Sequence, residues 1–103
     1  MYPLKYNTAS QEISLGVFVD EVDGYSPETG LTIANTDIKL HKSGTTTLAN
    51  KNSGGATHIS GGIYYCTLDA TDTGTYGPLT IYVDVSGARP VKVDCIVMEA
   101  NAI

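Results

Sequence analysis

The sequence predicts an all-β fold, an antiparallel β-sandwich of immunoglobulin-like or jelly-roll type with about seven or eight short strands. Apolar and polar residues alternate at period two in the segments 78–85 and 90–98, which is the pattern of strands with one buried face. Eleven glycines, seven tyrosines and no tryptophan suit strands and turns better than helices. No segment shows the periodicity of an amphipathic helix.

The segment 78–98 is predicted to form a β-hairpin. The polar link Ser86–Arg89 contains Gly87, which suits a tight turn. Pro90 begins the second strand, where its missing N–H costs no central ladder bond. The residues predicted to face inward are Leu79, Ile81, Val83 and Val85 in the first strand and Val91, Val93, Cys95 and Val97 in the second.

The segment 12–19 is predicted to be the first regular strand. Gly16 marks a bulge or a close backbone approach within it. Residues 2–8 precede this strand, and Pro3 suits either an extended arm or an edge strand. The predicted inward face carries Ile13, Leu15, Val17 and Val19, and the outer face carries Ser14, Gly16 and Phe18.

Short strands and turn signals alternate through the middle of the chain. The segment 20–30 is a predicted loop, because it contains three turn signals, Asp-Gly, Ser-Pro and Thr-Gly. The link 69–77 can hold a single helical turn at 70–72. The predicted elements are a strand or β-bridge at 31–34, a hairpin of 37–42 with 45–49, a strand at 56–60, and a strand at 63–68 in which Tyr64, Cys66 and Leu68 share a face.

The length suits one domain over residues 1–103, with residues 1–10 and 99–103 as docking arms. The net charge of −5 argues against a nucleic-acid partner. No apolar run is long enough to cross a bilayer, so no membrane partner is expected. The first residues lack the apolar core of a signal peptide, and synthesis in a reducing cytosol is expected.

The charges are segregated along the chain. Acids without bases occupy the segment 6–38, and lysines without acids occupy the segment 38–68. This asymmetry either steers a head-to-tail contact between copies or gives ordinary solvated faces, which is the favoured interpretation. The charged residues concerned are Glu12, Asp20, Glu21, Asp23, Glu28 and Asp37 in the first segment and Lys39, Lys42 and Lys51 in the second.

The histidines and cysteines give no predicted site. Neither His41 nor His58 has another ligand at metal spacing, and both are predicted to lie on the surface. Cys66 and Cys95 follow the phase of their apolar neighbours and are predicted to be buried free thiols. A disulfide between them or a Cys-His catalytic pair is the less favoured alternative. No catalytic, cofactor-binding or metal-binding residue is therefore predicted, and the chain is expected not to be an enzyme.

Carboxylates gather at the turn formed by Asp20, Glu21 and Asp23, with Glu28 nearby. Calcium favours such oxygen clusters, but the full calcium-loop spacing and its closing glutamate are missing. A turn capped by aspartate side chains is therefore the favoured interpretation.

The segment Asp72-Thr73-Gly74-Thr75-Tyr76 resembles the Asp-x-Gly-x-Tyr corner of immunoglobulin-like domains. In those domains the tyrosine hydroxyl bonds back to the backbone before the penultimate core strand. Pro78 stands where an antibody domain has its second cysteine. The resemblance therefore covers the corner and not a disulfide-bonded core.

The order of motifs over Ile13–Met98 resembles a family of small modules in tailed-bacteriophage virion structural proteins. The resemblance implies a non-enzymatic capsid decoration (cement) protein or tail-accessory module, which is assembled into the virion in the host cytoplasm. It offers no catalytic residue and no cofactor. The segments that carry it are Ile13–Asp20, Asp23-Gly24, Pro27–Ile33, Asp37–Leu40, Gly62–Tyr65, Leu68–Thr73 and Val85–Pro90.

The partners that this resemblance implies are the major capsid or tail protein and copies of the chain itself, as a homo-oligomer in the particle. Exposed strand edges and the two arms are the expected contacts. The alternative is a carbohydrate- or host-surface-binding module of a tail fibre or baseplate. Stacking faces would then come from Tyr25, Tyr64, Tyr65, Tyr76 and Tyr82.

Overall fold

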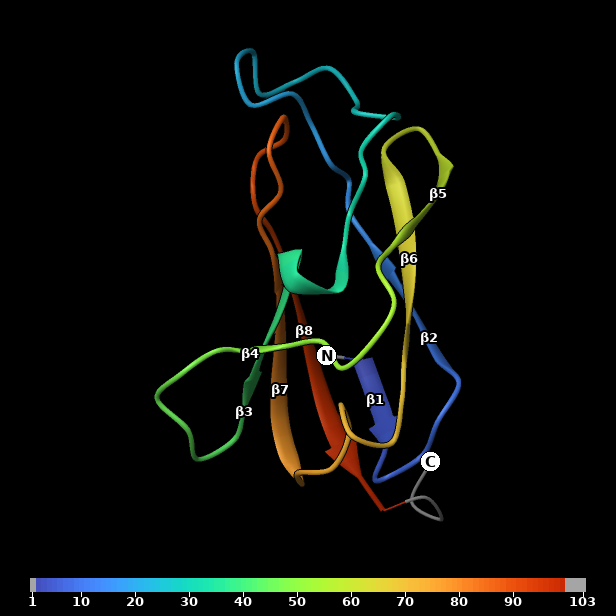
Figure 1. The fold of residues 1–103 in the computed structure, drawn as a ribbon, viewed down its shortest axis with the longest axis vertical. Coiled ribbons are helices and arrows are strands. Elements are labelled where there is room, and N and C mark those ends of the chain that lie inside the picture. Colours follow the sequence, from blue (N-terminus) through green and yellow to red (C-terminus); the bar gives the residue numbers. More distant parts are fainter. Residues whose placement is uncertain (1, 100–103) are drawn as a thin grey trace.

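Two β-sheets pack face to face in the computed structural model, which describes residues 2–99 (Figure 1). Sheet A has the strand order β1-β8-β7-β3-β4, and sheet B has the order β2-β6-β5. A short 3-10 helix, η1 (Asn35–Asp37), precedes β3. The predicted all-β sandwich is confirmed. The strands are β1 (Tyr2–Lys5), β2 (Gln11–Leu15), β3 (Ile38–Lys42), β4 (Ala49–Asn50), β5 (Thr57–Ser60), β6 (Ile63–Leu68), β7 (Gly77–Val83) and β8 (Val91–Met98).

The strand order matches the immunoglobulin-like alternative. In that fold strands B, E and D form one sheet, and strands C, F and G form the other. Strands β2, β6 and β5 have the first arrangement, and β3, β7 and β8 have the second, with β4 beside β3. Strand β1 pairs with β8 in parallel.

The described part of the chain contains no helix of the length and apolarity that a bilayer crossing requires.

The core lies between the two sheets and follows the predicted alternation in most strands. In β6 the shared face predicted at 63–68 is fully buried. In the hairpin of β7 and β8, Val91 and Val93 are only half-buried. The residues confirmed as buried are Leu79, Ile81, Val83, Val85, Cys95 and Val97 in this hairpin, with Ile38 and Leu40 in β3.

The predicted strand 12–19 is too long, and its second half has the wrong faces. Gly16 follows β2 with a φ of +129°, and a Cβ there would lie 2.8 Å from the carbonyl oxygen of Gly62. Phe18, predicted outside, is fully buried, and Val17, predicted inside, is half exposed. Glycine adopts a positive φ readily. At Gly16 this conformation shifts the alternation of buried and exposed side chains by one residue, so that Phe18 faces the core. The predicted close approach at Gly16 is confirmed.

Tyr64 in β6 joins sheet B to the segment that crosses its end. Its ring is fully buried and packs edge-on against Phe18, with 5.1 Å between ring centroids. Its hydroxyl accepts a hydrogen bond from the N–H of Leu31 (3.0 Å) and donates one to the carbonyl of Glu28 (3.0 Å). Two backbone groups far from β6 in sequence are therefore satisfied by one side chain.

Of the predictions for the segments 45–49, 31–34 and 69–77, the first is wrong and the other two are confirmed. The strand predicted at 45–49 is wrong in position, because residues 43–48 form an exposed turn in which the Thr45 hydroxyl donates to the Lys42 carbonyl at 2.9 Å. The bridge alternative for 31–34 is confirmed by the pairing of Ile33 with Ala56. A single turn follows β6, as predicted, with the N–H of Thr73 donating to the carbonyl of Asp69 at 3.3 Å.

The N-terminal segment forms an edge strand, which is one of the two alternatives predicted for it. Leu4 of β1 is fully buried, and the N–H of Tyr6 donates to the carbonyl of Met98 at 2.7 Å. The docking role of residues 1–10 stays a prediction, although residues 2–5 are part of sheet A. The second predicted arm, 99–103, lies outside the described residues except for Glu99.

The outer edge of β1 is blocked against further pairing. The side-chain amide of Gln11 accepts from the N–H of Lys5 (2.7 Å) and donates to its carbonyl (2.9 Å). Pro3 lies two residues earlier, on the same edge of the strand, and has no N–H. Prolines and capped backbone groups protect sheet edges from added strands. Gln11 also ties β2 of sheet B to β1 of sheet A on this side of the sandwich.

We expect the substitution Tyr64→Phe to lower the free energy of unfolding by about 1–3 kcal/mol, because it leaves two backbone groups without their hydrogen-bond partner. Tyr65→Phe is the matched control on the same strand, since no side-chain hydrogen bond is formed by Tyr65 within the described residues. Urea unfolding of both variants measures the difference. Equal stability of the two variants would contradict the assigned role of the Tyr64 hydroxyl.

Candidate functional site

The acidic segment at one end of the molecule is a capped turn. Asp20 Oδ1 accepts from the N–H of Val22 (2.6 Å), and Asp23 Oδ1 accepts from the N–H groups of Tyr25 (2.8 Å) and Ser26 (3.0 Å). The favoured interpretation of these carboxylates as turn caps is confirmed. Within residues 2–99 no group of three or more His, Cys, Asp or Glu side chains is placed to hold a metal ion.

The same hydrogen bonds set the acidity of this turn. The side-chain hydrogen bond from Ser26 lowers the pKa of Asp23, and the two backbone N–H groups act in the same direction. The side-chain hydrogen bond with Asp20 raises the pKa of Glu28, and partial desolvation and the neighbouring negative charges add to it. The segment therefore has a fixed backbone and a largely anionic surface at neutral pH.

The two histidines differ in their surroundings. His41 is exposed on β3, as predicted, and its Nε2 lies 2.8 Å from the carbonyl of Thr45. His58 in β5 is half-buried, and its ring meets Tyr64 at 5.0 Å between centroids. Its Nε2 is buried and has no hydrogen-bond partner among the described residues. The prediction of a surface position is therefore wrong for His58, because the bulky ring of Tyr64 covers one side of it.

Both cysteines are free and buried, as predicted. Desolvation by burial raises the pKa of the Cys66 thiol to about 11, and it raises the pKa of the Cys95 thiol to about 11 as well. A thiolate nucleophile needs an accessible and electropositive setting that lowers the pKa. The two thiols are therefore protonated at neutral pH and serve as small apolar side chains of the core.

The corner that the resemblance implied is not formed by Tyr76. Its ring is 51% exposed and lies flat against Tyr6, with 3.9 Å between centroids and 7° between planes. Within the described residues its hydroxyl has no hydrogen bond to the backbone. Instead, Asp72 and Thr73 order this link: the Asp72 carboxylate accepts from the N–H of Asn52 at 2.9 Å, and Thr73 is fully buried.

The tyrosines proposed as stacking faces do not gather into one site. Tyr64 is fully buried, so its faces are inaccessible to a ligand. Tyr25 lies at the acidic turn, whereas Tyr76 precedes β7 at the opposite end of the molecule (Figure 1). Tyr65 and Tyr82 lie in different sheets, in β6 and β7. The arrangement provides no shared aromatic platform for a sugar.

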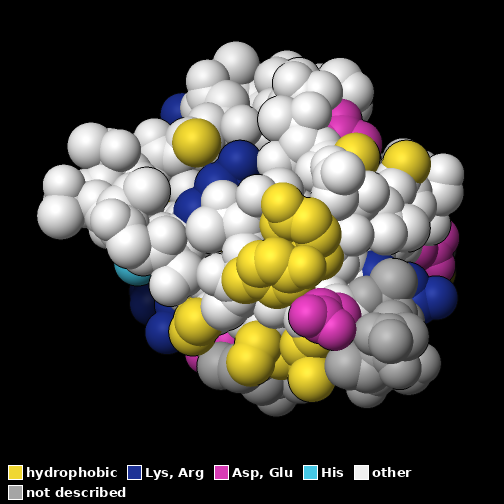
Figure 2. Space-filling model, turned by 90° about the horizontal axis from the view of Figure 1, so that it is seen from below, with side chains coloured by type: hydrophobic (Ala, Val, Ile, Leu, Met, Phe, Trp, Pro, Cys, Tyr) yellow, Lys and Arg dark blue, Asp and Glu magenta, His cyan; other side chains and the backbone are white. Residues whose placement is uncertain are grey.

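Apolar side chains are exposed at both ends of the long axis, which measures 41 Å. At the end that holds the acidic turn, Val22 is 86% exposed and Tyr25 is 84% exposed. At the other end, Figure 2 shows a hydrophobic patch at the centre of the surface. Tyr6 and Tyr76 belong to this end, since β1 finishes there and β7 starts there (Figure 1).

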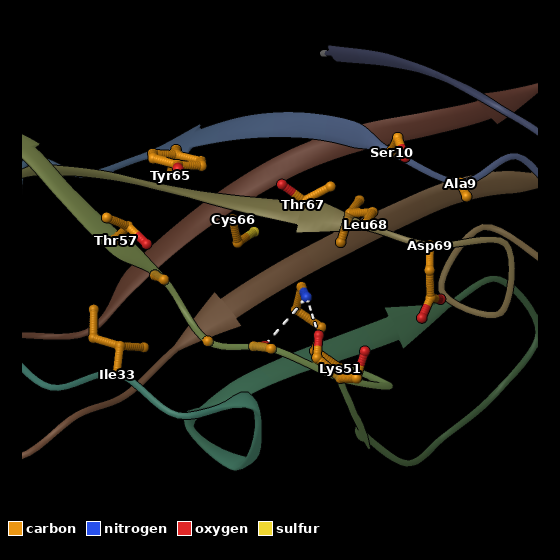
Figure 3. A pocket seen from close by; sticks show the side chains of 14 residues that line it. Ala9, Ser10, Ile33, Lys51, Thr57, Tyr65, Cys66, Thr67, Leu68 and Asp69 are labelled. Carbon is orange, nitrogen blue, oxygen red and sulfur yellow. Dashed lines mark hydrogen bonds between the residues drawn. The ribbon is translucent and has the colours of Figure 1, made fainter.

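A cavity of about 520 Å³ lies on the side of the sandwich opposite the β1 edge, between β6 and the segment 51–56 (Figure 3). Its volume is in the range of about 300–1,000 Å³ that is usual for ligand sites. The residues that line it are Ala9, Ser10, Ile33, Lys51, Ser53, Gly54, Gly55, Ala56, Thr57, Tyr65, Cys66, Thr67, Leu68 and Asp69.

Lys51 forms one wall of this cavity and is only 2% exposed. Its ammonium group donates to the carbonyls of Ser53 and Gly54. Figure 3 shows its side chain extending from the loop toward β6, with Cys66 and Leu68 directed into the same space. Within residues 2–99 no carboxylate lies within ion-pair distance of it, and its third N–H has no acceptor.

The opposite wall is the final part of β6. Strand β5 pairs with β6 only from Ile63 to Tyr65, whereas β2 pairs with β6 as far as Leu68. The chain before β5 turns away at Ala56, which pairs with Ile33 instead. The segment Cys66–Leu68 therefore has a strand neighbour on one side and the cavity on the other.

Sequence reasoning missed this cavity. From the sequence alone, Lys51 is expected on the surface, because buried lysines are rare. The carbonyls that bind its ammonium group belong to a loop and leave no recognisable pattern in the sequence. The glycines Gly54 and Gly55 were the available signal, since paired glycines permit close backbone approach. The early end of β5 depends on a contact with a distant residue, Ile33, which local patterns do not reveal.

The raised thiol pKa values predict a pH effect on stability. An unfolded thiol has a pKa of about 9.0, below the folded value of about 11, so the folded state holds its protons more tightly. The contribution of the thiols is fully present below pH 9 and is lost as the pH rises toward 11. The free energy of unfolding is expected to fall over that interval, and to fall less in the control variant Cys66→Ala/Cys95→Ala.

Alkylation by iodoacetamide at pH 8 tests the same burial directly. Both thiols are expected to react slowly in the folded chain and rapidly in urea, as followed by mass spectrometry. Rapid alkylation of the folded chain at pH 8 would contradict the burial of these two groups.

Comparison with protein-family models, with curated proteins and with solved structures gave no significant match. The functional features of the described residues are therefore read from their own surface, and they include the two apolar ends, the capped acidic turn and the cavity beside the unpaired edge of β6.

Proposed function

We propose that this chain is a non-enzymatic structural module of a tailed-bacteriophage virion, a capsid decoration (cement) protein or a tail-accessory protein. It binds neighbouring virion proteins, the major capsid or tail protein, and copies of itself. It acts within the virion, after assembly in the host cytoplasm, and it needs no cofactor. The order of motifs over Ile13–Met98 supports this proposal, and the two apolar ends of the sandwich carry it.

The apolar ends suit binding to other proteins because their backbones are fixed. The turn that presents Val22 and Tyr25 is capped by Asp20 and Asp23. At the other end the ring of Tyr76 is held by its stack on Tyr6. Exposed tyrosines on a rigid support give large contact areas at a low cost in side-chain entropy, and aromatic residues are enriched at interface centres.

The surface charges support a head-to-tail arrangement less strongly than the sequence indicated. The acids Asp20, Glu21 and Asp23 do gather at one end of the molecule. Lys51, however, is buried and contributes little to the surface charge. Among the basic side chains of sheet A, Lys39 and Lys92 flank Tyr82 in adjacent strands. Lys92 is also paired with Asp94 at 3.7 Å, so solvated faces stay the favoured interpretation of these charges, and the contact is assigned to the apolar ends.

The alternative function, a carbohydrate- or host-surface-binding module of a tail fibre or baseplate, has less support. Sugar sites combine an aromatic face with several convergent polar groups. Tyr65 is the only one of the five proposed tyrosines that lines the described cavity, and the others are buried or lie at separate places. Specific binding on a glycan array would favour this alternative.

The substitution Tyr76→Ser tests the proposal in virions. We expect it to reduce the number of copies per particle, with binding weaker by about tenfold or more, because a central aromatic contact is removed. Tyr82→Ser is the control, since Tyr82 lies on the outer face of sheet A away from both ends. Copies per particle are counted by quantitative mass spectrometry of purified virions, and cryo-electron microscopy locates them.

Two outcomes would contradict the proposal. One is absence of the chain from purified particles of cells that express it. The other is a copy number that Tyr76→Ser leaves unchanged relative to Tyr82→Ser.

A further inference from the structure

We infer that the cavity between β6 and the segment 51–56 binds an extended peptide segment of a neighbouring protein, which pairs with Cys66–Leu68 as an additional strand of sheet B. The inference rests on the proposed docking role and names the surface and the kind of partner. Addition of an extended peptide to a sheet edge is a recurrent mode of recognition, in which backbone hydrogen bonds supply affinity and side-chain pockets supply specificity.

The hydrogen-bonding groups for such a strand are present. Successive residues of a strand direct their N–H and C=O groups to opposite sides, so at least one residue of Cys66–Leu68 directs both groups toward the cavity. Strand β5 has left the ladder before this point. In the described part of the chain no backbone hydrogen bond from the segment 51–56 reaches these three residues.

The free edge of β6 is long enough for a short added strand. A strand advances about 3.3 Å per residue, so Cys66–Leu68 offers about 10 Å of edge, and a paired strand lies about 4.8 Å away. The far wall is held in place rather than free to close on β6. The Lys51 ammonium binds the carbonyls of Ser53 and Gly54, and the N–H of Ala56 donates to the carbonyl of Ile33 at 3.1 Å.

The lining specifies the chemistry of the bound segment. Ile33, Cys66 and Leu68 lie beneath the surface of the cavity and are at most 5% exposed, so the inward position of the bound segment is expected to be glycine or a small residue. Its outward side chains lie beside Thr57 and Thr67, at the exposed rim.

The edges of β1, β4 and β5 offer less to an added strand. Pro3 and Gln11 block the edge of β1. Strand β4 has only two residues, and the pairing of β5 is irregular between His58 and Ser60. Among the described residues, the final part of β6 is the edge that combines unpaired backbone with a cavity.

The test uses a random library of short linear peptides, selected on the folded chain. Selected peptides are expected to bind the unsubstituted chain and Ser60→Trp equally, and to bind Thr57→Trp about tenfold more weakly or worse. Thr57 and Ser60 are both exposed positions of β5, but of the two only Thr57 lines the cavity. A tryptophan at position 57 therefore blocks the cavity, whereas a tryptophan at position 60 leaves it open. Calorimetry measures both affinities.

Amide hydrogen exchange on the unsubstituted chain is the second measurement and does not depend on a variant. The bound peptide is expected to slow exchange within Cys66–Leu68. A library that yields no binder, binders that both tryptophan variants affect equally, or protection confined to other strands would overturn the inference.

Failure of this inference is distinguishable from failure of the proposed function. A chain that enters virions in a Tyr76-dependent manner but binds no peptide at β6 refutes only the strand-addition site. A chain that binds peptides at β6 but is absent from virions refutes only the virion setting.

Discussion

The contact between Gly55 and Ile33 determines the shape of one whole side of this sandwich. A Cβ at Gly55 would lie 1.7 Å from the carbonyl oxygen of Ile33, so only glycine lets the two backbones meet. The contact draws the chain away from β6 and places Ala56 in its bridge with Ile33. As a result β5 starts only at Thr57, and sheet B is incomplete beside the last part of β6.

The two sides of the sandwich are therefore built differently. On the β1 side the amide of Gln11 joins the sheets and blocks the outer edge. On the other side the buried stem of Lys51 covers the core, and its ammonium is satisfied by loop carbonyls. Burial of a lysine without a paired carboxylate is costly, so this wall depends on those carbonyls. On the first side the edge of the sheet is capped by a side chain, and on the second the last part of β6 has no strand neighbour.

The accessible surface differs in kind from the buried and capped groups of this protein. The thiols are buried and protonated, and the acidic turn uses its carboxylates to cap its own backbone. The accessible features are instead apolar side chains on fixed turns at both ends, Val22 with Tyr25 and the stacked Tyr76. Such features suit the proposed module that binds other proteins, and the strand-addition site proposed at the β6 edge is a directional complement to the apolar ends.

The fold class could be predicted from the sequence because alternation in β6, β7 and β8 is strong and each strand has one buried face. The immunoglobulin-like order could not be separated from the jelly-roll order, since pairing depends on contacts between distant residues. Local prediction failed where a glycine changed the backbone, as at Gly16, which moved Phe18 into the core. It also failed at the tyrosines: Tyr76 does not form the corner that the resemblance implied, and the tyrosine that bonds the backbone is Tyr64, whose partners Glu28 and Leu31 are distant in sequence.

The cavity could not be predicted from the sequence either, because it depends on contacts between residues that are distant in the chain. Its walls are brought together by the Gly55–Ile33 contact and by a lysine whose burial no local pattern reveals. The arrangement of the acidic turn, by contrast, could be predicted, because its caps bind the backbone within three residues.

A comparison of the stabilities of Gly55→Ala and Gly30→Ala tests whether the contact between Gly55 and Ile33 shapes this side of the sandwich. No atom lies within 4 Å of a Cβ built at Gly30, so that variant is expected to stay within about 0.5 kcal/mol of the unsubstituted chain. Gly55→Ala is expected to lower the free energy of unfolding by about 2 kcal/mol or more, because the two backbones must separate. Equal urea midpoints for the two variants would show that Gly55 does not meet Ile33 and would contradict the account of the open side of the sandwich.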